Sequence, residues 1–210
     1  MTTKSSLARQ KILDAASNAF AEEGFSGARV DEIADRAGVN KAMLYYHVGD
    51  KRALYNEVLN RNFGRIENAL EEGLPHEGSA SDRLRAVITI VERAIAANPD
   101  HPRIVLREFA SGAANLPAEI LQRMLGLLTV VRDILAEGTG SGEFRRTEPV
   151  KTHLTLIGAI LMLSVVSPLR ERVPDLGSPI DFPGADTDIA RFLGDLLLQG
   201  IAAPRSGEPT

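Results

Sequence analysis

The sequence predicts an all-α protein of roughly nine or ten helices. Apolar residues recur at intervals of three and four along most of the chain, which is the spacing that lines one face of an α-helix. No segment shows the alternation of apolar and polar residues expected of a half-buried strand, and no internal repeat is visible. Clusters of glycine and proline separate the periodic segments from one another. Together these observations favour packed helices over any fold that contains a sheet.

A first helix is expected to begin near Ser5 or Ser6 and to end at Gly24. Apolar residues fall on one face of it, at Leu7, Ile12, Leu13, Ala16 and Phe20. This face is expected to pack against the short helices that follow.

The segment from Ala28 to Leu54 predicts two short helices separated by a tight turn. In the first of them, an apolar stripe falls at Val30, Ile33, Ala34 and Ala37. Gly38 follows, where a left-handed backbone can end a helix without a side-chain clash, and Asn40 can cap the next helix. Two helices joined so tightly must cross steeply.

The second of these short helices is predicted to expose a set of side chains suited to DNA. Leu44 and Val48 lie four residues apart and are expected to face the preceding helix. The residues left outside are Lys41, Ala42, Tyr45 and parts of Met43, Tyr46 and His47. Lysine can neutralise phosphate, tyrosine can bond a phosphate or a base edge, and alanine permits close approach to the groove. Alternatively, Tyr45, Tyr46 and Tyr55 are half-buried aromatics of an ordinary core.

This run resembles the DNA-binding domain of the TetR family of bacterial transcriptional regulators over roughly 45 positions. The matching residues are Gly24-Phe25, Val30, Ile33-Ala34, Ala37-Gly38-Val39, Leu44-Tyr45-Tyr46-His47, Lys51 and Leu54. The resemblance implies an N-terminal three-helix helix-turn-helix DNA-binding domain, followed by a helical ligand-binding and dimerisation domain. It also implies that a ligand in the second domain shifts the recognition helix through the long helix that links the two.

Several departures from the family pattern bear on which DNA sequence is bound. Val48 stands where the family usually has phenylalanine, and Gly49-Asp50 replaces a proline-polar pair. Arg29 and Asn40 replace hydroxyl residues, and Arg29 could contact phosphate instead. The candidate DNA-binding residues are therefore Arg29, Asn40, Lys41, Ala42, Met43, Tyr45, Tyr46, His47 and Lys51.

The rest of the chain is predicted to form helices separated by glycine and proline breaks. Asp50 is expected to cap a long helix that ends at Gly73-Leu74-Pro75. Further helices are expected over residues 81–98, 104–111, 117–138, 148–168 and 186–201, with loops over 137–144 and 170–183. The predicted regions are a helix-turn-helix domain (1–52), a helical regulatory and dimerisation domain (53–204) and a disordered tail (205–210).

The helices near 117–137 and 148–167 are apolar around much of their circumference. Such a broad patch favours a dimer interface, and by resemblance these helices form the four-helix interface of a homodimer. Burial within the monomer is the alternative. A dimer would place its recognition helices roughly 34 Å apart and require a near-palindromic double-stranded DNA operator.

A ligand pocket is harder to predict, because pockets of this kind are lined by the same apolar types that fill cores. The candidates are Phe63, Ile66, Ile90, Phe109, Met124 and Leu128, and core packing is the alternative for each. The expected effector is a small apolar or amphipathic molecule.

Composition and motifs argue against several other classes of protein. The chain has no cysteine, which excludes disulfides and thiolate chemistry and fits a cytoplasmic location. The four histidines include no pair spaced as helical zinc ligands, so neither a metal nor a cofactor is expected. The most apolar stretch, residues 154–166, is too short to cross a membrane as a helix. No nucleotide-binding or hydrolase motif is present, so an enzyme is not expected.

The net charge of −4 hides a difference between the two parts of the chain. Residues 1–65 carry ten basic and eight acidic side chains, whereas the remainder has a net charge of −6. Local charge matters more than the total for attracting DNA. The sequence therefore favours a homodimeric repressor that is released from its operator by a ligand. The alternative is a helical dimeric adaptor or ligand sensor without specific DNA binding, which would leave Lys41, Tyr45 and Lys51 without a role.

Overall fold

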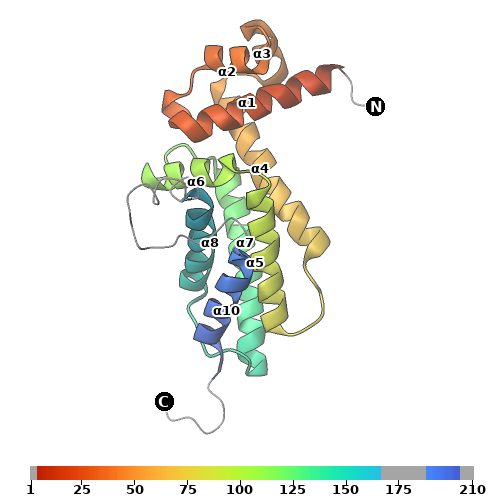
Figure 1. Ribbon diagram of the computed structural model, residues 1–210, viewed down its shortest axis with the longest axis vertical. Helices are drawn as coiled ribbons and strands as arrows, with labels where there is room; N and C mark the ends of the chain where they lie inside the picture. The colour runs from red at the N-terminus through yellow and green to blue at the C-terminus, as the bar shows by residue number, and fades with distance from the viewer. Residues whose placement is uncertain (1–3, 167–187, 204–210) are drawn as a thin grey trace, which may run out of the picture. The chain divides into compact units, whose positions relative to one another are not determined.

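The computed structural model describes residues 4–166 and 188–203, which form nine α-helices (Figure 1). The helices are α1 (Lys4–Gly27), α2 (Val30–Ala37), α3 (Lys41–Val48), α4 (Lys51–Gly73), α5 (Ala80–Ala96), α6 (Asp100–Ala110), α7 (Ala118–Ser141), α8 (Pro149–Val165) and α10 (Ile189–Ile201). The all-α prediction is confirmed over this part of the chain. The predicted loop at 170–183 and the predicted tail at 205–210 lie outside the described residues.

The chain divides into two compact units. The first unit comprises residues 1–65 and 98–122, and the second comprises residues 66–97 and 123–210. Helices α4 and α7 each contribute residues to both units. The predicted domain boundary after residue 52 stays a prediction.

The first unit is built around α1, which packs against α2, α3 and α6 (Figure 1). Its core contains fully buried apolar side chains from four helices, namely Ile12, Phe20, Ile33, Leu44, Leu54 and Leu59. Burying each such side chain contributes roughly 1.5–3 kcal/mol, so these contacts hold the short helices α2 and α3 in place.

The regular part of the first helix ends at Gly24, as predicted. Gly24 has φ +72° and interrupts the helix, but a last turn continues to Gly27. The guanidinium of Arg107, on α6, donates hydrogen bonds to the carbonyls of Ala21 (2.9 Å) and Glu22 (2.6 Å). These carbonyls lie just before the interruption, where a helix leaves acceptors unsatisfied. A tertiary contact therefore stabilises the kink.

In the second unit, α5, α8 and α10 pack against one another. The amphipathic face of α5 is buried as its spacing predicts, with Leu84, Val87, Ile88, Val91 and Ile95 at most 2% exposed. Glu143 accepts hydrogen bonds from the backbone N–H groups of Ala80 and Ser81 at the start of α5. These bonds lower the pKa of the Glu143 carboxyl.

The predicted loop at residues 137–144 is mostly helix instead. Helix α7 runs through Gly138 and Gly140 to Ser141, and Gly142, with φ +82°, follows its end. The ring of Phe144 folds back onto Gly138, in the space that a Cβ atom would occupy, and is only 3% exposed. The glycine at 138 thus permits a close packing contact rather than breaking the helix.

Candidate nucleic-acid interface

The turn between α2 and α3 has the backbone that its residues predict. Gly38 is left-handed, with φ +68° and ψ +33°, and the N–H of Val39 donates to the carbonyl of Ala34 at 3.0 Å. The side chain of Asn40 accepts a 2.8 Å hydrogen bond from the N–H of Met43 and so caps α3. Three residues therefore reverse the chain and start the second helix.

Helix α3 turns one face inward and presents the other to solvent. Leu44 is fully buried and Val48 is 7% exposed, as predicted. On the opposite side, Tyr46 is 86% exposed and Tyr45 is 43% exposed. Lys41, Ala42 and Met43 are also exposed, whereas His47 is half-buried. Of the three tyrosines, only Tyr55, which is 1% exposed, is part of the core, as the alternative interpretation proposed. Tyr45 and Tyr46 are not.

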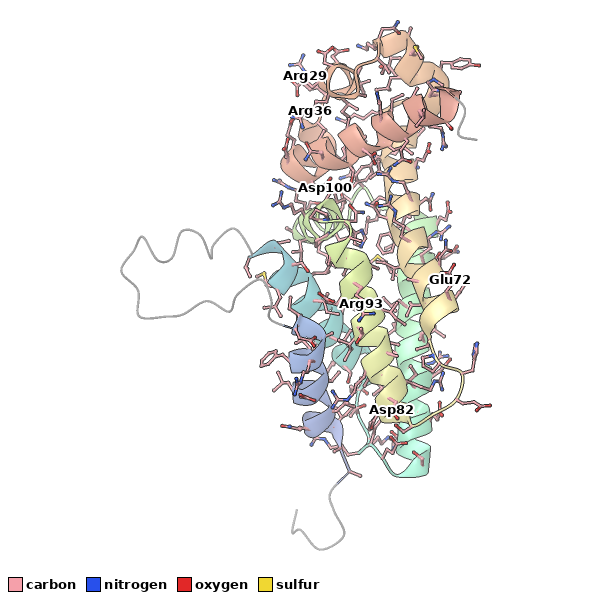
Figure 2. All side chains as sticks on the ribbon, turned by 45° about the vertical axis from the view of Figure 1, so that its right-hand side comes forward. Arg29, Arg36, Glu72, Asp82, Arg93 and Asp100 are labelled. Atoms are coloured by element: carbon pink, nitrogen blue, oxygen red, sulfur yellow. The ribbon has the colours of Figure 1, made fainter. Side chains whose placement is uncertain are left out.

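Each of the three predicted DNA-contacting cations already has a partner within the chain. Lys41 lies 2.7 Å from the carboxylate of Asp31 on α2, an ion pair that raises the pKa of the lysine. Arg29, which is labelled in Figure 2, lies 3.7 Å from Glu32, and its side chain is 70% exposed. These pairs leave both cations at the surface, where solvent and other anions can exchange with the carboxylates.

Lys51 is half-buried and has two uncharged partners. Its ammonium donates to the carbonyl of Ser26 at 3.3 Å and lies 5.0 Å from the centre of the Phe25 ring. The guanidinium of Arg52 lies 3.9 Å from the centre of the same ring. These contacts join the end of α1 to the start of α4.

Asp31 was not among the residues that the sequence singles out. The sequence does offer one indication of this residue: Asp31 and Lys41 are opposite charges on the outer sides of two helices joined by a three-residue turn. Sequence spacing alone does not show which of the charges on α2 meets Lys41, because that depends on the crossing angle of the helices.

The six candidate ligand-binding residues are divided between the two units. Phe63 and Phe109 belong to the first unit; Phe63 packs edge-on against His101, with ring centroids 5.0 Å apart, and Phe109 is 42% exposed. The other four, Ile66, Ile90, Met124 and Leu128, belong to the second unit. Ile66 is buried and the other three are half-buried. Their role in ligand binding stays a prediction.

Two of the histidines, His101 and His153, are buried in the interior. Burial lowers the pKa of His101 to about 4, and it also lowers the pKa of His153. Over residues 4–166 and 188–203, no three His, Asp or Glu side chains come together in a way that could hold a metal ion. In the same part of the chain, no helix is both long and apolar enough to span a membrane.

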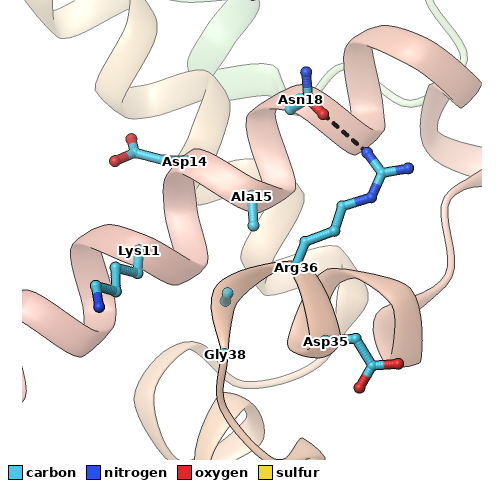
Figure 3. A pocket seen from close by; sticks show the side chains of 8 residues that line it. Lys11, Asp14, Ala15, Asn18, Asp35, Arg36 and Gly38 are labelled. Carbon is cyan, nitrogen blue, oxygen red and sulfur yellow. Dashed lines mark hydrogen bonds between the residues drawn. The ribbon is translucent and has the colours of Figure 1, made fainter.

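An open depression lies between α1 and α2 (Figure 3). Lys11, Asp14 and Asn18 line it from α1, and Asp35 and Arg36 from α2. The Arg36 guanidinium donates to Asn18 at 2.8 Å and also pairs with Glu22 at 2.7 Å, which raises its pKa. The polar groups here bind the two helices to each other.

The tight turn, the buried inner face of α3 and its exposed polar and aromatic outer face define a helix-turn-helix protein. Comparisons with known proteins extend this assignment. Residues 12–58 match the family model described as bacterial regulatory proteins, tetR family, and residues 77–164 match the one described as tetracyclin repressor-like, C-terminal domain. The chain belongs to the TetR family of bacterial transcriptional regulators.

Individual relatives support the same family over different lengths of chain. The HTH-type transcriptional repressor NicS of Pseudomonas putida is 27% identical over 195 residues, which cover 92% of both chains. The HTH-type transcriptional activator FasR of Mycolicibacterium smegmatis is 40% identical over 80 residues, or 38% of this chain, and the match spans 36% of the length of FasR. The crystal structure of FadR from Bacillus subtilis in complex with stearoyl-CoA has the same fold, with a TM-score of 0.64, 21% identity and coverage of 91% of this chain and 98% of FadR.

Proposed function

We propose that this regulator is a homodimeric repressor that binds a near-palindromic operator and leaves it when a small apolar or amphipathic ligand binds. The observation that carries the proposal is the outer face of α3, where Lys41, Tyr45 and Tyr46 are all exposed. A large aromatic side chain left 86% exposed gains nothing from the core, whereas it can contact bases in a major groove.

The roles of the interface residues follow from their chemistry. Lys41, Arg29 and Lys51 neutralise phosphates, and Asn40 positions α3 through its cap. Tyr45, Tyr46 and Met43 meet base edges or sugars, and Ala42 permits close approach to the groove floor. His47, which lies edge-on to Tyr46 at 5.3 Å, supports that tyrosine.

The dimer is supported by apolar side chains that the described chain leaves exposed. On α8, Val150, Leu154 and Met162 are 49%, 60% and 56% exposed and follow one face together with Gly158. On α7, Leu121 and Leu125 are exposed in the same way. Phe192 and Leu196 add a similar pair on α10, which the sequence did not single out. A second copy that covers these residues would remove a large apolar area from water.

The ligand acts by binding one conformer of the regulator better than another. An amphipathic effector is supported by the fold shared with FadR of Bacillus subtilis, which was solved with stearoyl-CoA. The repressor assignment is supported by NicS, the relative that aligns along 92% of the chain. Such a regulator works in the cytoplasm and catalyses no reaction.

The experiment that tests the DNA-binding role is selection of bound duplexes from a random pool by the purified protein, at two salt concentrations. Enrichment of a near-palindrome, with affinity that falls steeply as salt rises, is the expected result. Lys41→Ala and Tyr45→Ala should weaken binding without loss of helicity. The matched control is Arg93→Ala, which removes an exposed cation from α5 (Figure 2) and should bind like the wild type.

The alternative of a helical adaptor predicts a different result. The pool would then show no enrichment, and binding at low salt would be the same for the wild type and for a Lys41→Ala, Lys51→Ala variant.

A further inference from the structure

Asp31 is an exposed acidic residue of α2 that contacts the start of α3. It is the second residue of α2, and its carboxylate lies 2.7 Å from the ammonium of Lys41, the first residue of α3. Their side chains are 56% and 52% exposed, so the pair is open to the same solvent that a bound duplex would displace. Any phosphate that reaches Lys41 therefore meets Asp31 as well.

The other cations near this pair are also engaged within the chain. Arg29 faces Glu32 at 3.7 Å, and Arg36, the next cation along α2, is engaged by Glu22 and Asn18 on α1. The ammonium of Lys51 is occupied by the Ser26 carbonyl and the Phe25 ring. The start of α2 and the start of α3 thus carry two cations matched by two carboxylates.

The acidic side chains also change what the start of α2 can bind. A helix N-terminus attracts anions, because its first N–H groups are unsatisfied and its dipole is positive there. In α2 this end already carries Asp31 and Glu32 in its first turn. They stabilise the helix, and at the same time they repel a phosphate from the position that the dipole would favour.

From these contacts we propose that Asp31 competes with DNA phosphate for Lys41 and thereby limits the affinity of the regulator for DNA of any sequence. The inference rests on the proposed DNA-binding function. Exposed ion pairs are weak, so Lys41 can exchange Asp31 for a phosphate, but the carboxylate then remains close to the phosphate and repels it. The contacts of Tyr45 and Tyr46 with bases are unaffected, so Asp31 acts on the part of the affinity that is independent of sequence.

The direct test is Asp31→Asn, which keeps the shape of the side chain and removes its charge. Binding is measured by fluorescence anisotropy on the selected operator and on a shuffled duplex of equal length, over a series of salt concentrations. Both duplexes should bind about threefold to tenfold more tightly at low salt. The plot of log K against log salt should steepen by up to about 0.9, the value for one more neutralised phosphate.

Two further variants separate competition for Lys41 from a general change of charge. Asp35→Asn removes a carboxylate from the same helix, one turn further on, and should change affinity by less than twofold. In a Lys41→Ala background, Asp31→Asn should lose most of its effect, because the cation for which it competes is gone. Circular dichroism and thermal melting of each variant check that α2 remains folded.

Three outcomes of these experiments would contradict the inference or the function on which it rests. Weaker binding by Asp31→Asn would overturn the inference, since it would mean that Asp31 positions Lys41 for DNA or contacts a base itself. An unchanged affinity, or a gain on the operator alone, would overturn it too. If neither the wild type nor Asp31→Asn binds any duplex, the proposed DNA-binding function fails and the inference falls with it.

Discussion

The hydroxyl of Tyr55 donates a 2.7 Å hydrogen bond to Oε1 of Glu108, and the two residues are only 1% and 3% exposed. The bond joins α4 to α6 within the first unit. Glu108 also accepts from the N–H (3.2 Å) and the side-chain amide (3.3 Å) of Asn115, so its buried carboxylate has three donors. Burial and the carboxylate raise the pKa of the Tyr55 phenol, which keeps the donor protonated.

Tyr55→Phe should lower the free energy of unfolding by about 1–3 kcal/mol. The substitution removes one donor from a buried carboxylate and leaves the ring contacts with Phe20 and Phe25 in place. Chemical denaturation followed by circular dichroism measures the loss. Tyr46→Phe, which removes the same hydroxyl from an 86% exposed side chain, is the control and should change stability by less than about 0.5 kcal/mol. Equal losses in the two variants would contradict the assigned role of the Tyr55–Glu108 bond.

Two glycine substitutions should have opposite effects. Gly38→Ala places a side chain on a backbone with φ +68° and should cost about 1–2 kcal/mol, although nothing lies within 4 Å of the new Cβ atom. Gly64→Ala also meets nothing within 4 Å, but it lies inside the regular helix α4 and should add about 0.5–1 kcal/mol. Thermal and urea unfolding of both variants provide the comparison. A destabilised Gly64→Ala variant would contradict this prediction, because it would show that the substitution costs more in the folded chain than it gains by restricting the unfolded chain.

Acid should destabilise the protein through His101. Its pKa in the folded chain is about 4, below the ordinary value of 6.5, so the unfolded chain binds the proton first. Above about pH 6.5 the titration of His101 does not reduce the free energy of unfolding. Between about pH 6.5 and about pH 4 it lowers this free energy by about 1.4 kcal/mol per pH unit, or about 3 kcal/mol in total. Burial raises the pKa of the neighbouring Asp100, which opposes this trend, so a variant is needed to isolate the histidine.

His101→Gln removes the titrating group and keeps a polar side chain at this position. Unfolding by urea is followed for both proteins between about pH 6.5 and about pH 4. The wild type should lose more stability than the variant over that interval, while Asp100 affects both alike. Parallel curves would show that His101 is not responsible for the pH dependence.

Charge placed on the exposed face of α8 should break the proposed dimer. Leu154→Arg puts a cation in a position that is 60% exposed in the single chain, so the folded monomer should tolerate it. A buried, unpaired arginine in a dimer interface would be strongly unfavourable. Sedimentation equilibrium measures the mass. Leu7→Arg, at a 51% exposed position on α1, is the control and should leave the mass unchanged. A Leu154→Arg variant that still dimerises would exclude this face of α8 from the interface.

Most helix boundaries were predictable because they depend on local chemistry. Asp50 caps α4 by accepting from the N–H of Ala53 at 2.8 Å, as expected, and α4 ends at Gly73 before Leu74-Pro75. The helix end predicted at Gly138 is an exception. There the ring of Phe144 packs onto the glycine, and α7 continues past it to Ser141. Local propensity cannot include such contacts.

The sequence by itself determined which faces of the helices are apolar, and with them the helix-turn-helix and the outer face of α3. This was possible because a period of 3.6 residues assigns each side chain to a side of its helix before any tertiary contact forms. The crossing of α2 and α3 decided that Lys41 meets Asp31. The contacts of Tyr55 with Phe20 and Phe25 on α1 and with Glu108 on α6 decided that this tyrosine is buried, whereas Tyr46 is exposed. Helices that are separate in sequence meet at angles set by the packing of whole surfaces, so only the tertiary structure could pair these residues.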